Sequence, residues 1–238
     1  MIYNQNCLET MSNMPDNSID CVITSPPYDD LKGYNGYSFE FEKVAAELVR
    51  IIKPHGVIVW VVGDQCKNGS ESGTSFRQAL HFISLGLNLH DTMIYEKNSS
   101  TFPAQANSNR YTQIFEYMFV LSKGKPNATL LKDKENKWAG HKDYSGKLKN
   151  PVPSHSPRTN IWRYITSKNS SGHPAPFPAE LVKDHLLTWT QEEDLVYDPF
   201  MGSGTTAIVC EQMQRRWIGS EISTDYCNAA FERVFGKK

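Results

Sequence analysis

A stiff loop, Ser25-Pro26-Pro27-Tyr28, follows a segment that has the composition of a buried strand. β-Branched residues dominate residues 19–24 and favour a strand, which must end before the prolines because proline cannot donate to a strand ladder. The loop therefore lies at the carboxyl end of a strand, where open α/β sheets bind ligands. A rigid loop that ends in an aromatic ring is suited to hold something flat, although a turn that only ends the strand explains these four residues equally well.

A glycine-containing turn near the other end of the chain is the second segment that could hold a ligand. Residues 198–207 read Asp-Pro-Phe-Met-Gly-Ser-Gly-Thr-Thr-Ala. Gly202 and Gly204 let the backbone approach a ligand closely, and the predicted helix N-terminus beyond them favours a carboxylate or phosphate. The segment satisfies the Gly-x-Gly-x-x-Gly/Ala dinucleotide pattern, with Glu221 nineteen residues beyond Gly202 to meet ribose hydroxyls. Alone this pattern is weak, and the lack of a Gly-Lys-Ser/Thr sequence disfavours a Walker-type nucleoside triphosphatase.

Helical and extended patterns alternate along the chain, which predicts βαβ units and a largely parallel sheet. Helices are predicted at residues 39–53, 75–85, 178–189, 205–214 and 224–235. Strands are predicted at residues 19–24, 57–62, 89–95, 114–121, 195–197 and 217–219. Only 34 residues follow Gly204, too few to complete a doubly wound sheet, so the N-terminal half must complete it. The nucleoside-binding half thus comes last, which is a circularly permuted order.

Composition bounds the class of protein. The 238 residues suffice for one α/β domain with an insertion. The five cysteines are odd in number and form no Cys-x-x-Cys pair, which argues against a disulfide framework or a closed zinc site and for a reducing compartment. No basic segment followed by an apolar run opens the sequence, and no window approaches eighteen apolar residues. We therefore expect a cytoplasmic protein with no metal and no membrane contact.

The net charge of −1 hides an uneven distribution. Residues 123–168 hold eleven Lys or Arg and three acidic residues, a balance of +8, so the rest of the chain carries −9. Aromatic residues, Trp138, Tyr144, Trp162 and Tyr164, are interleaved with these charges. A basic segment with aromatics on an acidic body is typical of a protein that contacts a phosphate backbone, and a solvated lysine-rich loop is the alternative.

These motifs resemble those of the β group of S-adenosylmethionine-dependent DNA amino-methyltransferases, which methylate the exocyclic amine of cytosine or adenine. Residues 24–28 resemble their catalytic motif, residues 198–206 their cofactor motif, residues 219–222 the strand end that holds the ribose, and residues 173–178 the segment before the first cofactor-binding helix. The order of catalytic loop, recognition segment and cofactor turn defines the β group. The resemblance covers most of the chain except residues 123–170.

The resemblance implies a circularly permuted Rossmann-like methyltransferase fold of the α/β class, with a mostly parallel seven-stranded sheet flanked by helices and an irregular basic insertion. Residues 1–122 would form the catalytic half, residues 123–170 the basic target-recognition insertion, and residues 171–238 the S-adenosylmethionine-binding half of the same domain. The implied partner is DNA, expected to be double-stranded. A cognate restriction endonuclease is an open alternative, and so is the choice between monomer and homodimer.

The resemblance also implies the site. Ser25, Pro26, Pro27 and Tyr28 would be catalytic: the Ser25 hydroxyl and the Pro26 carbonyl accept from the target amine, and Tyr28 stacks on a base flipped from the duplex. The implied cofactor-binding residues come from both ends of the chain and are Asn6, Cys7, Thr24, Phe177, Asp198, Pro199, Phe200, Gly202, Ser203, Gly204, Thr205 and Glu221. The family usually has Gly-Asp before Cys-Leu where this chain has Gln5-Asn6, so the Asn6 oxygen would accept from the adenine amine more weakly than a carboxylate.

The family associates Ser-Pro-Pro-Tyr with N4 of cytosine and Asp-Pro-Pro-Tyr with N6 of adenine, with exceptions. We therefore predict an N4-cytosine methyltransferase, with an N6-adenine enzyme as the alternative. A C5-cytosine methyltransferase would need a Pro-Cys nucleophile, and a zinc deaminase would need His-x-Glu and Pro-Cys-x-x-Cys; the sequence has neither. A non-catalytic nucleic-acid-binding protein is the alternative from another class, and it would not need the cofactor turn.

Overall fold

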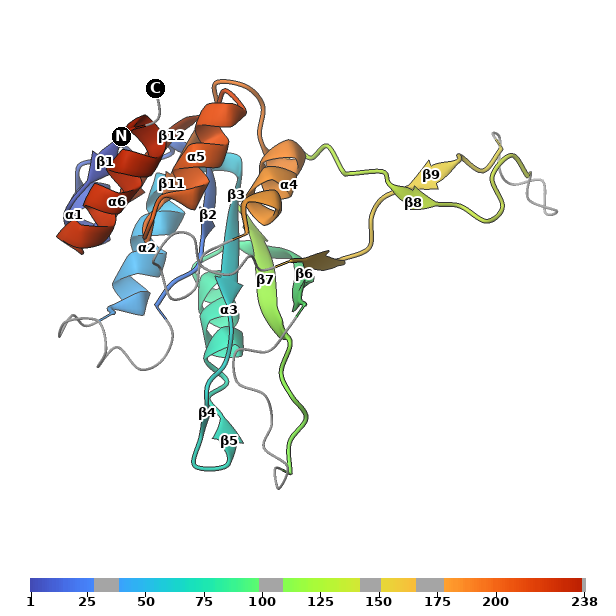
Figure 1. The fold of residues 1–238 in the computed structure, drawn as a ribbon, viewed down its shortest axis with the longest axis horizontal. Helices are drawn as coiled ribbons and strands as arrows, with labels where there is room; N and C mark the ends of the chain where they lie inside the picture. The colour runs from blue at the N-terminus through green and yellow to red at the C-terminus, as the bar shows by residue number, and fades with distance from the viewer. Residues whose placement is uncertain (28–38, 99–108, 142–150, 166–177, 237–238) are drawn as a thin grey trace.

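An eight-stranded sheet runs through the part of the chain that the structure, a computed structural model, describes: residues 1–27, 39–98, 109–141, 151–165 and 178–236 (Figure 1). Its strands are β1 (Ile2–Tyr3), β2 (Ile19–Thr24), β3 (Ile52–Val62), β6 (Asn88–Lys97), β7 (Phe115–Ser122), β10 (Ile161–Tyr164), β11 (Leu195–Asp198) and β12 (Arg216–Ser220). They lie in the order β1-β12-β11-β2-β3-β7-β6-β10. Within these strands, β7 alone runs antiparallel to its neighbours, so the predicted mostly parallel sheet is confirmed.

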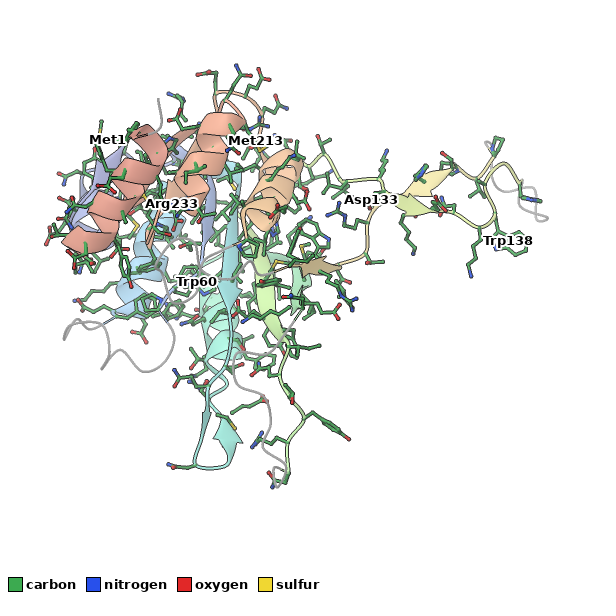
Figure 2. All side chains as sticks on the ribbon, viewed as in Figure 1. Met1, Trp60, Asp133, Trp138, Met213 and Arg233 are labelled. Carbon is green, nitrogen blue, oxygen red and sulfur yellow. The ribbon has the colours of Figure 1, made fainter. Side chains whose placement is uncertain are left out.

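Helices cover both faces of the sheet. They are α1 (Cys7–Ser12), α2 (Phe41–Ile51), α3 (Thr74–Ser84), α4 (Ala179–Trp189), α5 (Thr205–Gln212) and α6 (Thr224–Phe235). The first three share one apolar core and the last three share the other. Trp60 of β3 is fully buried near the middle of the molecule, and its indole N–H donates to Gln78 of α3 (Figure 2). The central strand β3 is thus apolar on both faces because both faces are covered.

The two ends of the chain meet in the sheet. β1 pairs in parallel with β12, and the N-terminal ammonium group of Met1 donates to the carbonyl of Trp217. On its other side β12 pairs with β11, which in turn pairs with β2. The C-terminal βαβ unit therefore lies between two strands from the N-terminal part, which is the permuted order that the sequence predicts.

The junction between α2 and β3 differs from the prediction. The strand begins at Ile52 rather than at residue 57, because residues 53–56 form a bulge against β2: the register passes from Ile19–Ile52 to Cys21–Val57. A bulge accommodates Pro54, which cannot donate to the ladder, and His55, whose φ is +69°. At Gly56 a Cβ atom would lie 2.9 Å from the carbonyl oxygen of Asp20, so a larger residue would clash with β2.

The predicted insertion is less irregular than expected, and the sheet has eight strands rather than seven. Residues 123–165 include a short pair, β8 (Lys134–Glu135) with β9 (His155–Ser156), and the strand β10, which pairs in parallel with β6. β10 alternates exposed and buried residues, with Trp162 and Tyr164 turned into the core. The described residues also include an unpredicted hairpin of β4 (Cys66–Lys67) and β5 (Ser70–Glu71).

All five cysteines are free thiols in the structure. Four of them are buried, and Cys66 is exposed in the β4–β5 hairpin. Within the described residues, no helix has the length and apolar character needed to cross a membrane.

A buried histidine joins α4 to the sheet. His185 is fully buried; its Nδ1 accepts from the Trp189 indole at 3.2 Å, and its Nε2 lies 3.5 Å from the sulfur of Met118. The ring also lies 4.8 Å from the ring of Trp162. Burial lowers the pKa of His185 to about 3, because the charged imidazolium would lose its hydration in the core. The folded protein therefore holds this ring neutral.

We predict that this histidine makes the fold sensitive to acid. Because the pKa of His185 is about 3 in the folded chain and near 6.5 in the unfolded one, the unfolded state binds the extra proton between these values. The free energy of unfolding should then fall by up to about 1.4 kcal/mol per pH unit as pH drops from 6.5 toward 3. Denaturant unfolding at several pH values should show a shallower loss for His185→Gln, whose amide oxygen can still accept from Trp189. The matched control is His155→Gln at an exposed histidine, and equal slopes in all three proteins would contradict the prediction.

Candidate active site

The predicted catalytic loop and the predicted glycine turn start from adjacent strands. β2 ends at Thr24 and β11 ends at Asp198, and the strands run parallel side by side. The Thr24 hydroxyl donates a 2.7 Å hydrogen bond to Asp198 Oδ1 across 174 residues of sequence, and both residues are buried. The two motifs thus meet at the carboxyl edge of the sheet, the edge at which α/β sheets bind ligands.

Asp198 is a buried carboxylate held by three protein donors. Its Oδ1 accepts from the Thr24 hydroxyl and the Phe200 N–H, and its Oδ2 accepts from the Thr206 hydroxyl at 2.7 Å. Burial raises the pKa of Asp198 to about 6, although these hydrogen bonds oppose the rise; the nearby Glu221 adds to it. Since a carboxylate oxygen can accept two hydrogen bonds, Oδ2 can receive a further donor from a ligand.

The glycine turn depends on backbone conformations that other residues rarely adopt. Gly202 has φ +53° and Gly204 has φ +80°, both left-handed. Gly204 also packs closely on α6, since a Cβ atom there would lie 3.0 Å from the Cβ of Ala230. The turn leads directly into α5 at Thr205, whose side chain is buried with that of Ser203. The first N–H groups of α5 therefore lie beside the carboxyl ends of the central strands.

Glu221 follows β12 and faces the glycine turn. Its Oε2 accepts a 2.8 Å hydrogen bond from the Gly202 N–H, and its Oε1 accepts a 2.9 Å bond from the Ser223 N–H. Because β12 pairs with β11, Glu221 and Asp198 lie at the ends of adjacent strands, with the turn between them. Each Glu221 oxygen, like Asp198 Oδ2, can accept a second hydrogen bond.

The start of the chain borders this turn. Asn4 donates to the carbonyl oxygens of Glu221 and Ile222, so the segment after β1 is tied to the end of β12. Asn6 caps α1, because its Oδ1 accepts from the Leu8 N–H at 2.9 Å. Cys7 is buried, and burial raises the pKa of its thiol to about 12, so it is a neutral apolar group. The segment that carries both predicted residues is therefore tied to the end of β12 through Asn4, and one acceptor site of Asn6 is already used within the protein.

The predicted catalytic loop is described only in part. Ser25 and Pro27 are half-buried and Pro26 is buried, directly after the buried strand end. Tyr28 and Phe177 lie outside the described residues. Pro199 is buried, and the ring of Phe200 packs edge-on against Phe39 at 5.4 Å. The structure thus shows a packing role for the Phe200 ring, while its backbone N–H serves Asp198.

Sequence reasoning missed two residues that hold the turn. Thr206 lies within the quoted motif, and its hydroxyl is the donor to Asp198 Oδ2. Arg233 of α6 donates through Nη1 to the carbonyl and, at 2.7 Å, to the hydroxyl of Ser203. Burial lowers the pKa of Arg233. Arg233 comes thirty residues after Ser203 and belongs to no local pattern, so only the packing of α6 on the turn reveals it.

The groups at this edge fit an organic ligand with donors at two points. Two carboxylates on adjacent strand ends can accept from an ammonium group and from vicinal hydroxyls, and the glycines leave room for close backbone contact. No group of three or more His, Cys, Asp or Glu able to hold a metal ion occurs among the described residues. The two carboxylates therefore suit a ligand that presents an ammonium group at one point and vicinal hydroxyls at another.

Comparison with known proteins gives concordant matches. A family model described as DNA methylase, of the N6/N4 methyltransferases, matches residues 19–232. The orphan methyltransferase M.BamHII of Bacillus amyloliquefaciens is 51% identical over 93% of this chain and 91% of its own length. The Type II methyltransferase M.BglII of Bacillus subtilis is 27% identical over 99% of this chain and 69% of its own.

Solved structures show the same fold. The PvuII DNA methyltransferase, cytosine-N4-specific, superposes with a TM-score of 0.79 at 23% identity, over 100% of this chain and 86% of its own. The likeness in fold agrees with the permuted sheet and the position of the glycine turn. Because the family model spans most of the chain and a relative is about half identical over nearly its whole length, this chain belongs to the N6/N4 family of DNA methylases.

Proposed function

We propose that this DNA methyltransferase transfers a methyl group from S-adenosylmethionine to N4 of a cytosine in duplex DNA, at a specific site. The family and the site geometry support the methyl transfer to an exocyclic amine, and Ser25, in place of an aspartate before Pro26-Pro27, supports cytosine. Among proteins of this fold, the PvuII enzyme is cytosine-N4-specific. The observation that carries the proposal is the hydrogen bond from Thr24 to Asp198, which puts the Ser-Pro-Pro loop beside the glycine turn.

The cofactor supplies an electrophilic methyl group on a sulfonium centre. In our proposal Asp198 Oδ2 accepts from the methionine ammonium group, and Glu221 accepts from the ribose hydroxyls. The solved structure of M1.HpyAVI in complex with S-adenosylmethionine has the same fold, with a TM-score of 0.69. The Asn6 oxygen and Cys7 would border the adenine, since Asn4 ties their segment to the end of β12. Pro199, Gly202, Ser203, Gly204 and Thr205 would shape the pocket through their backbone, and Phe177, outside the described residues, stays a prediction.

The loop supplies acceptors for the target amine. The amine lone pair is delocalised into the base, so the nitrogen is a poor nucleophile until its hydrogens are held. The Ser25 hydroxyl and the Pro26 carbonyl would accept those hydrogens and favour pyramidal nitrogen, while Pro27 keeps the acceptors fixed. The new N–C bond forms as the S–C bond breaks, and the amine then releases one proton. Tyr28 would stack on the flipped base.

The proposal assigns a separate role to each of three segments of the chain. Residues 1–122 would form the catalytic half, 171–238 the cofactor half, and 123–170 the contacts that select the target. A cognate restriction endonuclease and the choice between monomer and homodimer stay predictions, and M.BamHII, the relative of highest identity given above, is named an orphan methyltransferase.

The modified base can be identified directly. Duplex DNA methylated by the enzyme with labelled cofactor, then digested to nucleosides, should give N4-methyldeoxycytidine. Label in N6-methyldeoxyadenosine would establish the adenine alternative, because both amines suit the same loop chemistry. DNA binding with no label in any nucleoside, in the presence of bound cofactor, would favour the non-catalytic alternative.

Neutralising either carboxylate should weaken cofactor binding. A charge-assisted hydrogen bond contributes roughly 1.5–3 kcal/mol, so Asp198→Asn or Glu221→Gln should lower S-adenosylmethionine affinity about ten- to a hundredfold by calorimetry. Because the pKa of Asp198 is about 6 without ligand, protonation should reduce wild-type affinity below pH 6, by up to about tenfold per pH unit. Asp198→Asn should remove this dependence. Asp225→Asn, at an exposed residue of α6, is the matched control, and wild-type affinity in both site variants would refute the pocket.

Substitutions in the loop should separate catalysis from cofactor binding. Removing the ring in Tyr28→Ala takes away stacking worth roughly 1–3 kcal/mol, so single-turnover methyl transfer should slow substantially while cofactor affinity stays near wild type. Tyr28→Phe should retain much of the rate. Ser25→Ala should slow transfer with less effect on DNA affinity, since its acceptor acts on the transition state. A wild-type single-turnover rate in Tyr28→Ala, in protein of normal melting temperature, would end the assignment of this loop.

A further inference from the structure

A two-stranded ribbon projects from the body of the protein (Figure 1). It comprises the described residues 131–141 and 151–158, and is called the ribbon below. β8 and β9 pair antiparallel within it, and further backbone hydrogen bonds extend the pairing in both directions. Towards the body the Arg158 N–H donates to the Leu131 carbonyl, and towards the tip the Val152 N–H donates to the His141 carbonyl. The ribbon is therefore one continuous hairpin stem.

The ribbon has no core of its own. Most of its side chains are exposed, and Leu131, at its root, is the ribbon side chain that packs against the apolar core. An isolated two-stranded hairpin is marginally stable in water, because neither face is covered. A stem that stands free and is bare on both faces is thus expected to acquire its covering from a partner.

The tip and strands of the ribbon indicate the chemistry of that partner. Trp138 lies near the far end, 69% exposed, with the His141 ring edge-on at 5.7 Å (Figure 2). Lys132, Lys134 and Lys137 are exposed along the same strand. Over residues 131–141 and 151–158 the sequence holds four Lys or Arg and two acidic residues, a balance of +2 on a chain whose net charge is −1. Such a combination of cationic side chains and a bare indole suits a polyanion that presents flat or apolar edges.

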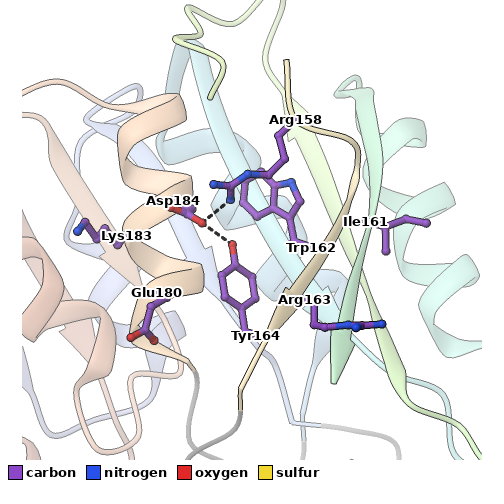
Figure 3. A pocket seen from close by; sticks show the side chains of 8 residues that line it. All are labelled: Arg158, Ile161, Trp162, Arg163, Tyr164, Glu180, Lys183 and Asp184. Atoms are coloured by element: carbon purple, nitrogen blue, oxygen red, sulfur yellow. Dashed lines mark hydrogen bonds and ion pairs between the residues drawn. The ribbon is translucent and has the colours of Figure 1, made fainter. Parts of the chain in front are cut away.

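The root of the ribbon is held by one arginine (Figure 3). Arg158 Nη1 lies 2.6 Å from Asp184 of α4, and its Nε donates at 2.6 Å to Asp133 on the opposite strand of the ribbon. Its guanidinium lies over the ring of Trp162, 5.2 Å from the centroid. The Tyr164 hydroxyl also donates to Asp184. Paired carboxylates raise the pKa of Arg158, so it stays charged, and its own charge is taken up within the protein.

Resting on the proposed function, we propose that the ribbon enters the major groove of duplex DNA, with Trp138 against base edges, and that Arg158 is the positioning residue that fixes its angle to the body. The major groove is about 12 Å wide and admits a two-stranded β-ribbon, whereas the minor groove, about 6 Å wide, does not. The exposed lysines of the 131–141 arm would then lie near phosphates that border the groove. Arg158 ties both strands' root to α4, so the tip keeps a set distance from the carboxyl edge of the sheet.

Tryptophan fluorescence provides a direct test. Of the five tryptophans, Trp138 is 69% exposed and the others are at most 8% exposed, so acrylamide quenching of the whole protein reports on Trp138. Saturating sheared chromosomal DNA should lower the quenching constant of the wild type severalfold, to that of Trp138→Phe. Protection should persist on DNA whose minor groove is filled by netropsin, and should be lost on DNA whose major groove is filled by glucosylated 5-hydroxymethylcytosine. The reverse pattern would overturn the assignment to the major groove.

Affinity measurements test the contact itself. Trp138→Ala should bind duplex DNA roughly tenfold more weakly, the scale of one good base contact, with unchanged cofactor affinity and melting temperature. The matched control is Phe231→Ala, which removes an exposed aromatic residue of α6 away from the ribbon. This variant should bind DNA as the wild type does. If duplex DNA is bound and methylated while Trp138 stays open to acrylamide and Trp138→Ala binds normally, the ribbon proposal fails and the proposed function stands. If the folded, cofactor-bound wild type neither binds nor methylates DNA, both fail.

The positioning role of Arg158 has its own readout. Arg158→Met keeps the aliphatic stem but removes both ion pairs, so the Trp138 fluorescence anisotropy should fall and DNA affinity should drop at least as much as in Trp138→Ala. Arg215→Met, which removes an arginine that holds the carbonyls of Thr190 and Met213, is the matched control and should change neither. Unchanged anisotropy and affinity in Arg158→Met would refute the positioning role. If acrylamide quenching of Trp138 fell with rising protein concentration in the absence of DNA, the partner of the ribbon would be a second copy of the chain and not DNA.

Discussion

The buried carboxylate of Asp198 is the group on which the site depends. Burial penalises its charge, and its pKa is raised to about 6, so the fold must supply donors to hold it. Those donors come from different parts of the chain: Thr24 ends an N-terminal strand, whereas Phe200 and Thr206 belong to the C-terminal turn and helix. Satisfying one carboxylate thus joins the predicted catalytic loop to the glycine turn and leaves one acceptor site that, in our proposal, receives a ligand.

The permuted sheet makes this junction possible. If β11 and β12 formed the end of an independent sheet, the turn at Gly202 would have the end of β12 beside it but no strand end from the N-terminal part. Pairing β1 with one side of this unit and β2 with the other gives the turn two neighbours from the N-terminal part. Two residues of α6 contact the turn: Arg233 donates to Ser203, and Ala230 packs against Gly204. The left-handed backbone of the turn is therefore held from the N-terminal segment, from the adjacent strands and from the last helix.

The sequence predicted the elements with strong periodicity, and both motifs, because these depend on residues near one another in the chain. Thus the helix predicted at residues 178–189 is α4 (Ala179–Trp189). It did not predict β10, since four residues with Trp162 and Tyr164 alternating inward are too short a signal in a segment rich in lysine and proline. The bulge at Pro54 and the contact of Arg233 with Ser203 depend on packing between distant segments, and no local pattern encodes them.

Burial constrains the residues of the body much more than those of the ribbon. The body must hold a cofactor pocket with buried charge, so its residues are constrained by two cores and by Asp198. The ribbon buries little, so substitutions beyond its root cost little folding free energy and, in our proposal, could alter which base edges it contacts. Its attachment, however, is made by Arg158 to Asp184, one residue from His185 in the core. In our proposal, a recognition element that is free to vary is thereby fixed to a helix that packs on the core, and that attachment would set the distance between the bases it contacts and the base that is methylated.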